Sequence, residues 1–145
     1  MCTLQDEPIL IDSQKDPPIT YKVRSVHRRR GNANKSIWTI KIPEEVECFR
    51  QTYTSLWLEE TKGWGLKLSA TSQLEEVGVS DQGQILKIAK FRDDEADGIW
   101  HGYPANYCYK PQDKPSKKIL LKWLEAGLID KTQKSRISQG KLCNL

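Results

Sequence analysis

Two stretches of this chain carry complete helix signals, and most of the sequence between them is divided into short β-prone pieces. Pro43 suits the first turn of a helix, and the acidic residues after it complement the positive end of the helix dipole. Apolar residues then recur at helical spacing, which predicts a helix over 44–55. A second helix is predicted between Ser116, a good N-cap, and Gly127, a good stop signal, with leucines forming an apolar stripe.

The other segments favour strands. Alternating residues flank a link rich in turn formers, which predicts a β-hairpin over 21–42 with a basic tip. The β-prone residues 52–58 offer a strand as the alternative to the end of the first helix. Shorter elements are expected as a turn at 62–65 and as strands at 65–70, 84–91 and 135–138. The pattern predicts an α+β fold: a small antiparallel sheet with an N-terminal hairpin, one central helix and one C-terminal amphipathic helix.

A length of 145 residues fits one compact domain, which we place at 21–145. Residues 1–20 contain three prolines and little periodicity, so we expect an extended or mobile arm in which 8–11 could add an edge strand. No apolar run approaches the roughly 20 residues that cross a bilayer, and no signal peptide is visible. We therefore expect a cytoplasmic protein that does not contact membranes.

The cysteine and histidine spacing argues against a metal site. The four cysteines are far apart and form no Cys-x-x-Cys pair, and the two histidines are also distant from one another. Reduced thiols are the simplest interpretation. No phosphate-binding glycine motif or nucleophile elbow is present, so the sequence predicts neither a metal nor a cofactor.

The net charge of +4 conceals an uneven distribution. Residues 21–42 carry seven Lys and Arg and no acid, and residues 110–145 carry nine Lys and Arg against three acids. The segment between them is acidic, with twelve Asp and Glu against six bases over 43–109. Two basic blocks that met on one face would attract polyanions, of which nucleic acid is the commonest. The sequence leaves open whether the basic blocks meet or instead pair with the acidic segment.

Residues 100–109 concentrate groups that suit a binding or active-site loop. They hold four of the twelve aromatic residues and one of the two histidines, His101. Aromatic faces stack on bases in single-stranded nucleic acids, and imidazole transfers protons near neutral pH. The candidate stacking or interface residues are Trp100, Tyr103, Tyr107 and Tyr109. The bland alternative is that these aromatics cap a small core and that His101 is a turn residue.

Lysines at the start of the C-terminal helix add a second signal. Lys114, Lys117 and Lys118 lie at the end of a helix that favours negative charge, and a bound anion would remove that conflict. The full set of candidate anion-binding or nucleic-acid-binding residues is Arg28, Arg29, Arg30, Lys35, Lys114, Lys117 and Lys118. The alternative is an ordinary solvated surface, since lysines are tolerated at the start of most exposed helices.

Three functions follow from these features. The first is binding of nucleic acid, with RNA or single strands favoured, through the basic residues and the aromatic loop. The second is a protein-interaction module, an inhibitor or accessory subunit, that binds a partner protein through the same aromatic loop. The third is a metal-independent nuclease with His101 as general acid or base and His27 as a second such group.

Overall fold

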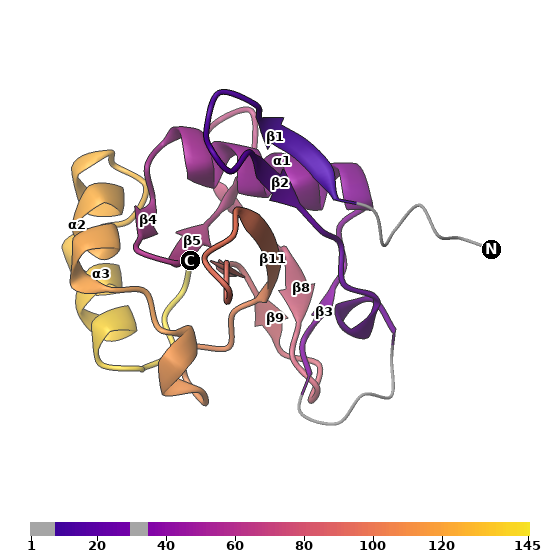
Figure 1. The fold of residues 1–145 in the computed structure, drawn as a ribbon. Helices are drawn as coiled ribbons and strands as arrows, with labels where there is room; N and C mark the ends of the chain where they lie inside the picture. Colours follow the sequence, from indigo (N-terminus) through magenta and orange to yellow (C-terminus); the bar gives the residue numbers. More distant parts are fainter. Residues whose placement is uncertain (1–7, 30–34) are drawn as a thin grey trace.

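The computed structural model describes residues 8–29 and 35–145, and within these ranges the chain forms three α-helices, a six-stranded sheet and two small sheets (Figure 1). The order of the large sheet is β1 (Ile9–Asp12), β2 (Ile19–Tyr21), β11 (Ile99–Pro104), β10 (Ala89–Arg92), β5 (Lys62–Gly65) and β4 (Leu58–Glu59). The α+β class is confirmed. The expectation of a small, purely antiparallel sheet is wrong, because β2 and β11 pair in parallel inside a larger sheet.

The predicted hairpin over 21–42 is also wrong. β2 lies between β1 and β11, whereas β3 (Ile37–Trp38) joins a separate sheet with β8 (Gly78–Val79) and β9 (Ile85–Leu86). A 3-10 turn, η2 (Ser25–His27), turns the chain away between β2 and β3. An alternating pattern predicts a strand but not the strand that it pairs with. Here β3 pairs with β8 and not with β2, the preceding strand in the sequence. The expected edge strand near residue 9 is present as β1.

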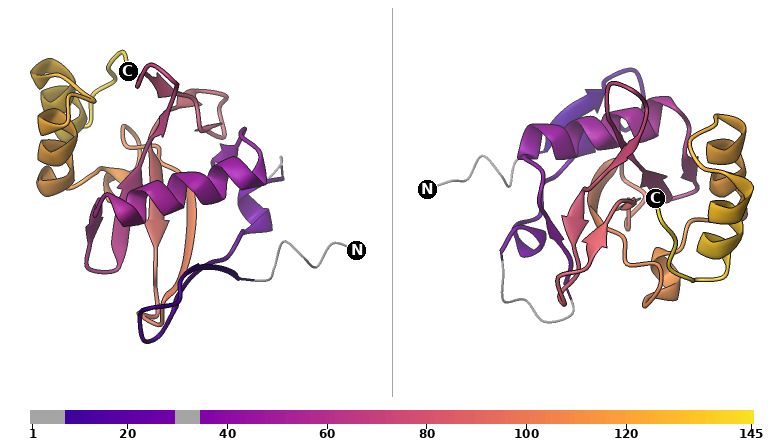
Figure 2. Two further views of the ribbon diagram at one scale, coloured as in Figure 1. Left: turned by 90° about the horizontal axis from the view of Figure 1, so that it is seen from above. Right: turned by 180° about the vertical axis from the view of Figure 1, so that it is seen from behind.

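One face of the large sheet is covered by α1 (Ile42–Thr54), which confirms the first predicted helix (Figure 2). Phe49 is fully buried between Tyr21, Phe91 and Trp100, with ring centroids 5.0 to 5.5 Å away. Gly65 of β5 permits this close approach, because a Cβ there would lie 2.0 Å from Thr52 Oγ1. These aromatic contacts form the first of two hydrophobic cores.

The second core lies under a pair of C-terminal helices, α2 (Lys117–Glu125) and α3 (Lys131–Ser138), which run side by side at one end of the molecule (Figures 1 and 2). The α2 prediction is confirmed: Ser116 Oγ accepts a hydrogen bond from the Ile119 N–H, and Gly127 has a φ of +76°. The predicted strand at 135–138 is wrong. Asp130 begins a helix there through a capping box with Gln133, and Ile137 is fully buried.

Three further corrections concern the turn, strand and loop expected between residues 62 and 109. The predicted turn at 62–65 is the strand β5, whose two glycines lie beneath α1, and the first half of the expected 100–109 loop belongs to β11. The predicted strand at 84–91 is divided into β9 and β10. The short strand expected within 65–70 is present as β6 (Lys67–Leu68), paired with β7 (Leu74–Glu75). None of the helices in the described ranges is long and apolar enough to cross a membrane.

Candidate anion-binding pocket

The face of the large sheet opposite α1 carries polar side chains at its β10–β11 hairpin. Arg92 lies directly across from His101, and Lys90 lies across from Tyr103. Successive residues of a strand point to opposite faces, so these four share one face while Phe91 and Trp100 point toward α1. Asp93 accepts hydrogen bonds from the backbone of Asp97 and Gly98 and so fixes the turn that sets this register.

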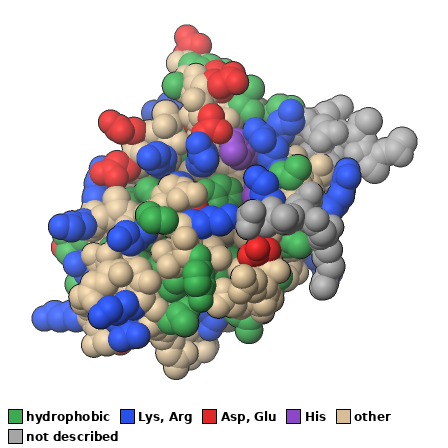
Figure 3. Space-filling view, turned by 90° about the horizontal axis from the view of Figure 1, so that it is seen from below, with side chains coloured by type: hydrophobic (Ala, Val, Ile, Leu, Met, Phe, Trp, Pro, Cys, Tyr) green, Lys and Arg blue, Asp and Glu red, His purple; other side chains and the backbone are tan. Residues whose placement is uncertain are grey.

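A hollow of about 310 Å³ lies over this polar face, and both histidines of the chain line it. We call it the bihistidine pocket and define it by His27, His101 and the cations Arg24, Lys35, Arg92 and Lys110. Arg24 and Lys35 come from the first basic block, and Lys110 comes from the second. Figure 3 shows histidine side chains on a face where Lys and Arg gather. The two basic blocks therefore do contribute to one site.

His27 is held in a defined ring orientation at the side of the pocket. Its Nδ1 lies 3.0 Å from the Ser36 carbonyl oxygen, and its ring stacks on Tyr103 with centroids 5.0 Å apart. Because a carbonyl oxygen only accepts hydrogen bonds, Nδ1 carries the proton, and in the neutral imidazole Nε2 has the lone pair. Burial, the largest influence, lowers the pKa of His27, so the ring is neutral at pH 7.

His101 is constrained differently. Its Nε2 lies 3.0 Å from Asp94 Oδ2, and its Nδ1 is buried with no hydrogen-bond partner among the described residues. Burial lowers the pKa of His101 despite the nearby carboxylate, whereas the hydrogen bond from His101 lowers the pKa of Asp94. An ionised Asp94 accepts the Nε2 proton, so the remaining lone pair of a neutral His101 is on the buried nitrogen.

Buried hydrogen bonds fix the floor of the pocket. Asp113 is 1% exposed and accepts hydrogen bonds from the Tyr103 hydroxyl and the Asn106 backbone, both at 2.8 Å. It belongs to a short 3-10 turn, η3 (Pro111–Asp113), to which Lys90 is also joined through the Gln112 carbonyl. Burial lowers the pKa of Lys90 to about 8. These contacts hold the loop that delivers Lys110 against the sheet.

The arginine run 28–30 does not act as one exposed unit. Arg28 donates hydrogen bonds to the buried carboxylate of Glu45 and to the Ile40 carbonyl, with Nη2 2.5 Å from Glu45 Oε1. Arg29 is exposed, and Arg30 lies outside the described residues. Lys35 is exposed at the bihistidine pocket. Of the four candidates in the first basic block, Arg28 therefore contributes to the fold, because its guanidinium pairs with a charge that would otherwise be buried alone.

The lysines of the second block lie outside the bihistidine pocket. Lys117 and Lys118 are exposed in the first turn of α2, and Lys114 donates a hydrogen bond to the Ser138 carbonyl at 3.0 Å. The N-terminal end of α2 and the bihistidine pocket are thus two separate basic features. Lys110 is the lysine of the second basic block that lines the pocket.

The four candidate aromatic residues have unequal surroundings. Trp100 is 5% exposed in the first core, Tyr103 packs on His27, and the Tyr107 hydroxyl donates to the Lys141 carbonyl at 2.9 Å. Tyr109 is 62% exposed, and its hydroxyl accepts a hydrogen bond from Gln84 at 3.3 Å. Tyr109 borders a smaller hollow that shares Lys110 with the bihistidine pocket. Among the four, Tyr109 is the one that offers an exposed ring, and it lies next to Lys110.

Three cations of the pocket were not among the residues predicted from the sequence: Arg24, Arg92 and Lys110. A usable signal existed for Arg92. The run Asp93–Gly98 is a turn between two alternating segments, and interpreting it as a hairpin would have placed Arg92 opposite His101. No local pattern predicts that Arg24 reaches the same hollow, because that depends on the chain turning at η2.

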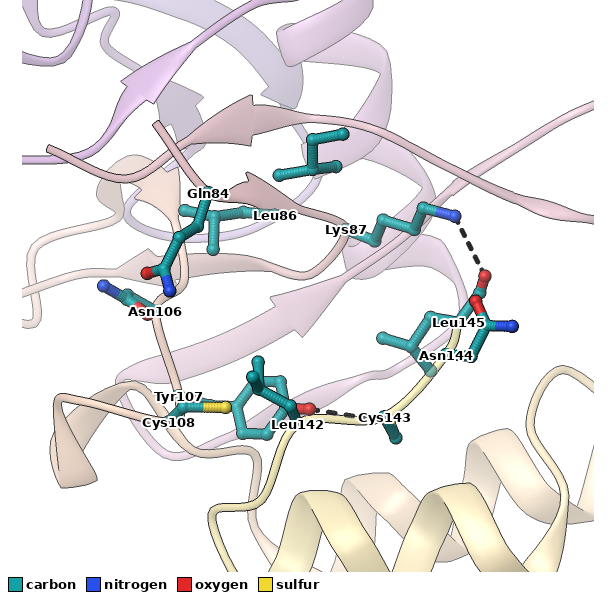
Figure 4. Close-up of a pocket in the computed structure, with 11 residues that line it drawn as sticks. Gln84, Leu86, Lys87, Asn106, Tyr107, Cys108, Leu142, Cys143, Asn144 and Leu145 are labelled. Atoms are coloured by element: carbon teal, nitrogen blue, oxygen red, sulfur yellow. Dashed lines mark hydrogen bonds between the residues drawn. The ribbon is translucent and has the colours of Figure 1, made fainter. Parts of the chain in front are cut away.

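A second cavity, of about 290 Å³, lies between β9, the loop after β11 and the last residues of the chain (Figure 4). Leu86, Tyr107 and Leu142 supply apolar surface. Lys87 Nζ donates to the Leu145 carbonyl at 2.9 Å, and Tyr107 Oη lies 3.5 Å from Cys143 Sγ. Its one cation is engaged by the chain itself, so this cavity lacks the array of positive charge that distinguishes the bihistidine pocket.

Within the described ranges, no three His, Cys, Asp or Glu side chains gather in a way that could hold a metal ion. Comparisons of this chain with protein-family models, with curated proteins and with solved structures find no match. The bihistidine pocket, where cations from both basic blocks meet, is therefore the feature that points to a function.

Proposed function

We propose that the protein binds single-stranded nucleic acid, preferentially RNA, with backbone phosphate in the bihistidine pocket. The observation that carries this proposal is the convergence of Arg24 and Lys35 from one basic block with Lys110 from the other around a single hollow. Arg92 adds a fourth cation, and its side chain is 41% exposed. Such an array attracts phosphate and makes affinity dependent on salt.

The exposed ring of Tyr109 supports a single strand as the ligand. Tyr109 directly precedes Lys110, and Lys110 lines both hollows. A phosphate at the bihistidine pocket would therefore place a neighbouring nucleotide within reach of the Tyr109 ring. Stacking on an exposed aromatic requires an unpaired base, and it contributes about 1–3 kcal/mol per base. A duplex would keep its bases stacked on one another.

The test is fluorescence anisotropy of labelled oligouridine RNA across a salt series, with the matched DNA strand and a DNA duplex as competitors. The double variant R24A/K35A removes two pocket cations. It is expected to bind about tenfold or more weakly and to flatten the dependence of log affinity on log salt by about 1.4, since each single-strand phosphate contact contributes about 0.7.

The control is K131A/K134A, which removes the same charge from α3, where both lysines border a different depression. This variant should keep nearly the wild-type affinity and slope. Equal losses in both double variants would show that net charge alone drives binding. Absence of binding by the wild-type protein at low salt would overturn the proposal and leave a protein partner at this face as the function to test.

A further inference from the structure

His27 combines three features of a positioned general base. Its ring is held from one side by the Ser36 carbonyl, 3.0 Å from Nδ1, and from another by the Tyr103 ring. Its neutral tautomer has the lone pair on Nε2. Cations that would stabilise developing negative charge on a phosphate line the same hollow.

The two histidines are not equivalent in this respect. His101 has its Nε2 proton directed at Asp94, and its Nδ1 is buried, so accepting a proton from a ligand in the pocket would require the ring to leave Asp94. His27 needs no such rearrangement, because its hydrogen-bonded nitrogen is the one already occupied by a backbone carbonyl. The geometry therefore favours His27 over His101 as the base.

We propose that His27 acts as the general base in cleavage of RNA bound at the bihistidine pocket, an activity that rests on the proposed RNA binding. The 2′-hydroxyl of the ribose attacks the adjacent phosphorus, and His27 Nε2 takes the hydroxyl proton. The P–O5′ bond breaks, the 5′-oxygen takes a proton from water, and the products are a 2′,3′-cyclic phosphate and a 5′-hydroxyl end. Arg24 and Arg92 stabilise the extra negative charge on the phosphoryl oxygens in the transition state.

In the test, the purified protein is incubated with end-labelled oligouridine RNA in EDTA and the cleavage products are followed. The fully 2′-deoxy strand of the same sequence is the control. RNA should be cut to 2′,3′-cyclic phosphate ends, whereas the deoxy strand should bind without being cut. H27N keeps an N–H donor for the Ser36 carbonyl and should lower the cleavage rate by about 10²–10⁴-fold. K131A, which lies outside the bihistidine pocket, should bind and cleave RNA as the wild type does.

The outcomes separate this inference from the proposed function. RNA binding without cleavage, or cleavage by H27N at the wild-type rate, overturns the role of His27 and leaves the binding proposal intact. If H27N fails to fold, as judged by circular dichroism, the pH–rate profile of the wild type decides. Burial lowers the pKa of His27 below 6.5, so the rate should fall on acidification through that lowered pKa as the base becomes protonated. A rate that does not fall at any acidic pH at which the protein stays folded overturns the inference.

Discussion

The two faces of the six-stranded sheet have different roles. The face under α1 holds Phe91 and Trp100, which both make ring contacts with Phe49 of the helix, and all three side chains are at most 5% exposed. On the other face of the β10–β11 hairpin lie Arg92 and His101, which both contact Asp94 directly and line an open hollow. Adjacent residues of the same two strands thus belong to a dry core and to a polar pocket.

This contrast separates what stabilises the protein from what is available to a ligand. The α1 face removes large aromatic surfaces from water, and such burial is the dominant stabilising contribution in a small domain. The pocket face gathers four cations around one hollow, which favours anion binding, and its exposed Arg92–Asp94 ion pair adds little to stability. Substitutions on the α1 face should therefore mainly lower the free energy of unfolding, whereas substitutions on the pocket face should mainly weaken ligand binding.

The largest expected effect is on the α1 face, in F91A. Phe91 is fully buried against Tyr21, Trp38 and Phe49, so the variant should lose about 3–5 kcal/mol of unfolding free energy. Urea denaturation measures this loss. L10A, which truncates an exposed leucine on β1, is the control and should change stability by about 0.5 kcal/mol or less. A loss below about 1 kcal/mol in F91A would contradict the assignment of this core.

A smaller loss is expected in G65A, which adds one methyl group where α1 meets β5. The new Cβ would collide with Thr52 Oγ1, so we expect a destabilisation of about 1–3 kcal/mol. The double variant G65A/T52A removes the atom responsible and should show favourable coupling in a double-mutant cycle. Simple additivity of the two single variants would mean that the helix does not pack this closely on the strand.

The next largest effect is expected in the pH dependence of stability, to which the two histidines of the pocket face contribute. Burial lowers the pKa of both His27 and His101 below 6.5, so the unfolded chain takes up protons first as the pH falls. Their contribution is complete above pH 6.5 and declines below it, toward the folded-state pKa values. Burial raises the pKa of Glu45, which acts with the opposite sign.

The measurement is therefore a comparison of wild type with the H27N/H101N double variant by urea midpoints between pH 7.5 and 5.5. The wild type should lose more stability than the variant over this interval, because Glu45 is common to both. An identical pH profile for the two proteins would contradict the lowered pKa values of the histidines.

The smallest effect on stability is expected in R92A. The Arg92 side chain is 41% exposed, and its 2.9 Å contact with Asp94 is a surface ion pair, so unfolding should change by about 0.5 kcal/mol or less. RNA affinity measured on the same preparation should nevertheless fall. A destabilisation above about 1 kcal/mol would show that the pocket face is also part of the structural core.

Local signals predicted the two helices that have strong ends. Pro43 with its following acids, and Ser116 with Gly127, act within one or two turns of chain, and the structure confirms both helices. The same kind of signal also exists at Asp130 and Gln133, a capping box that would have replaced the strand predicted at 135–138 by a helix.

The strand errors have a different origin. Gly63 and Gly65 resemble turn residues, and only the presence of α1 above them explains two glycines in a central strand. The 21–42 hairpin was the shortest connection available, but Ile37 pairs with Val79. Both outcomes depend on contacts between residues far apart in sequence, which a reading of local pattern does not contain.

The sequence predicts several residues of the candidate site, but it does not predict that they come together in one pocket. The sequence predicts His101 and Lys35 as site residues and His27 as a second acid or base, and all three line the bihistidine pocket. Arg28 looks like its neighbours in sequence, yet it pairs with buried Glu45. Whether a given arginine is used by the fold depends on an acid 17 positions away, so the three arginines could not be separated by sequence reasoning.

The parallel pairing of β2 with β11 has a consequence for how the chain reaches its native state. Tyr21 pairs with Trp100, 79 positions further along, whereas the β10–β11 hairpin closes through a short turn. Contacts of such separation require a large loop to close, and they slow folding. We therefore expect the hairpin that carries Arg92 and His101 to form early, and the β1–β2 ribbon to dock afterwards as the late step that completes the sheet.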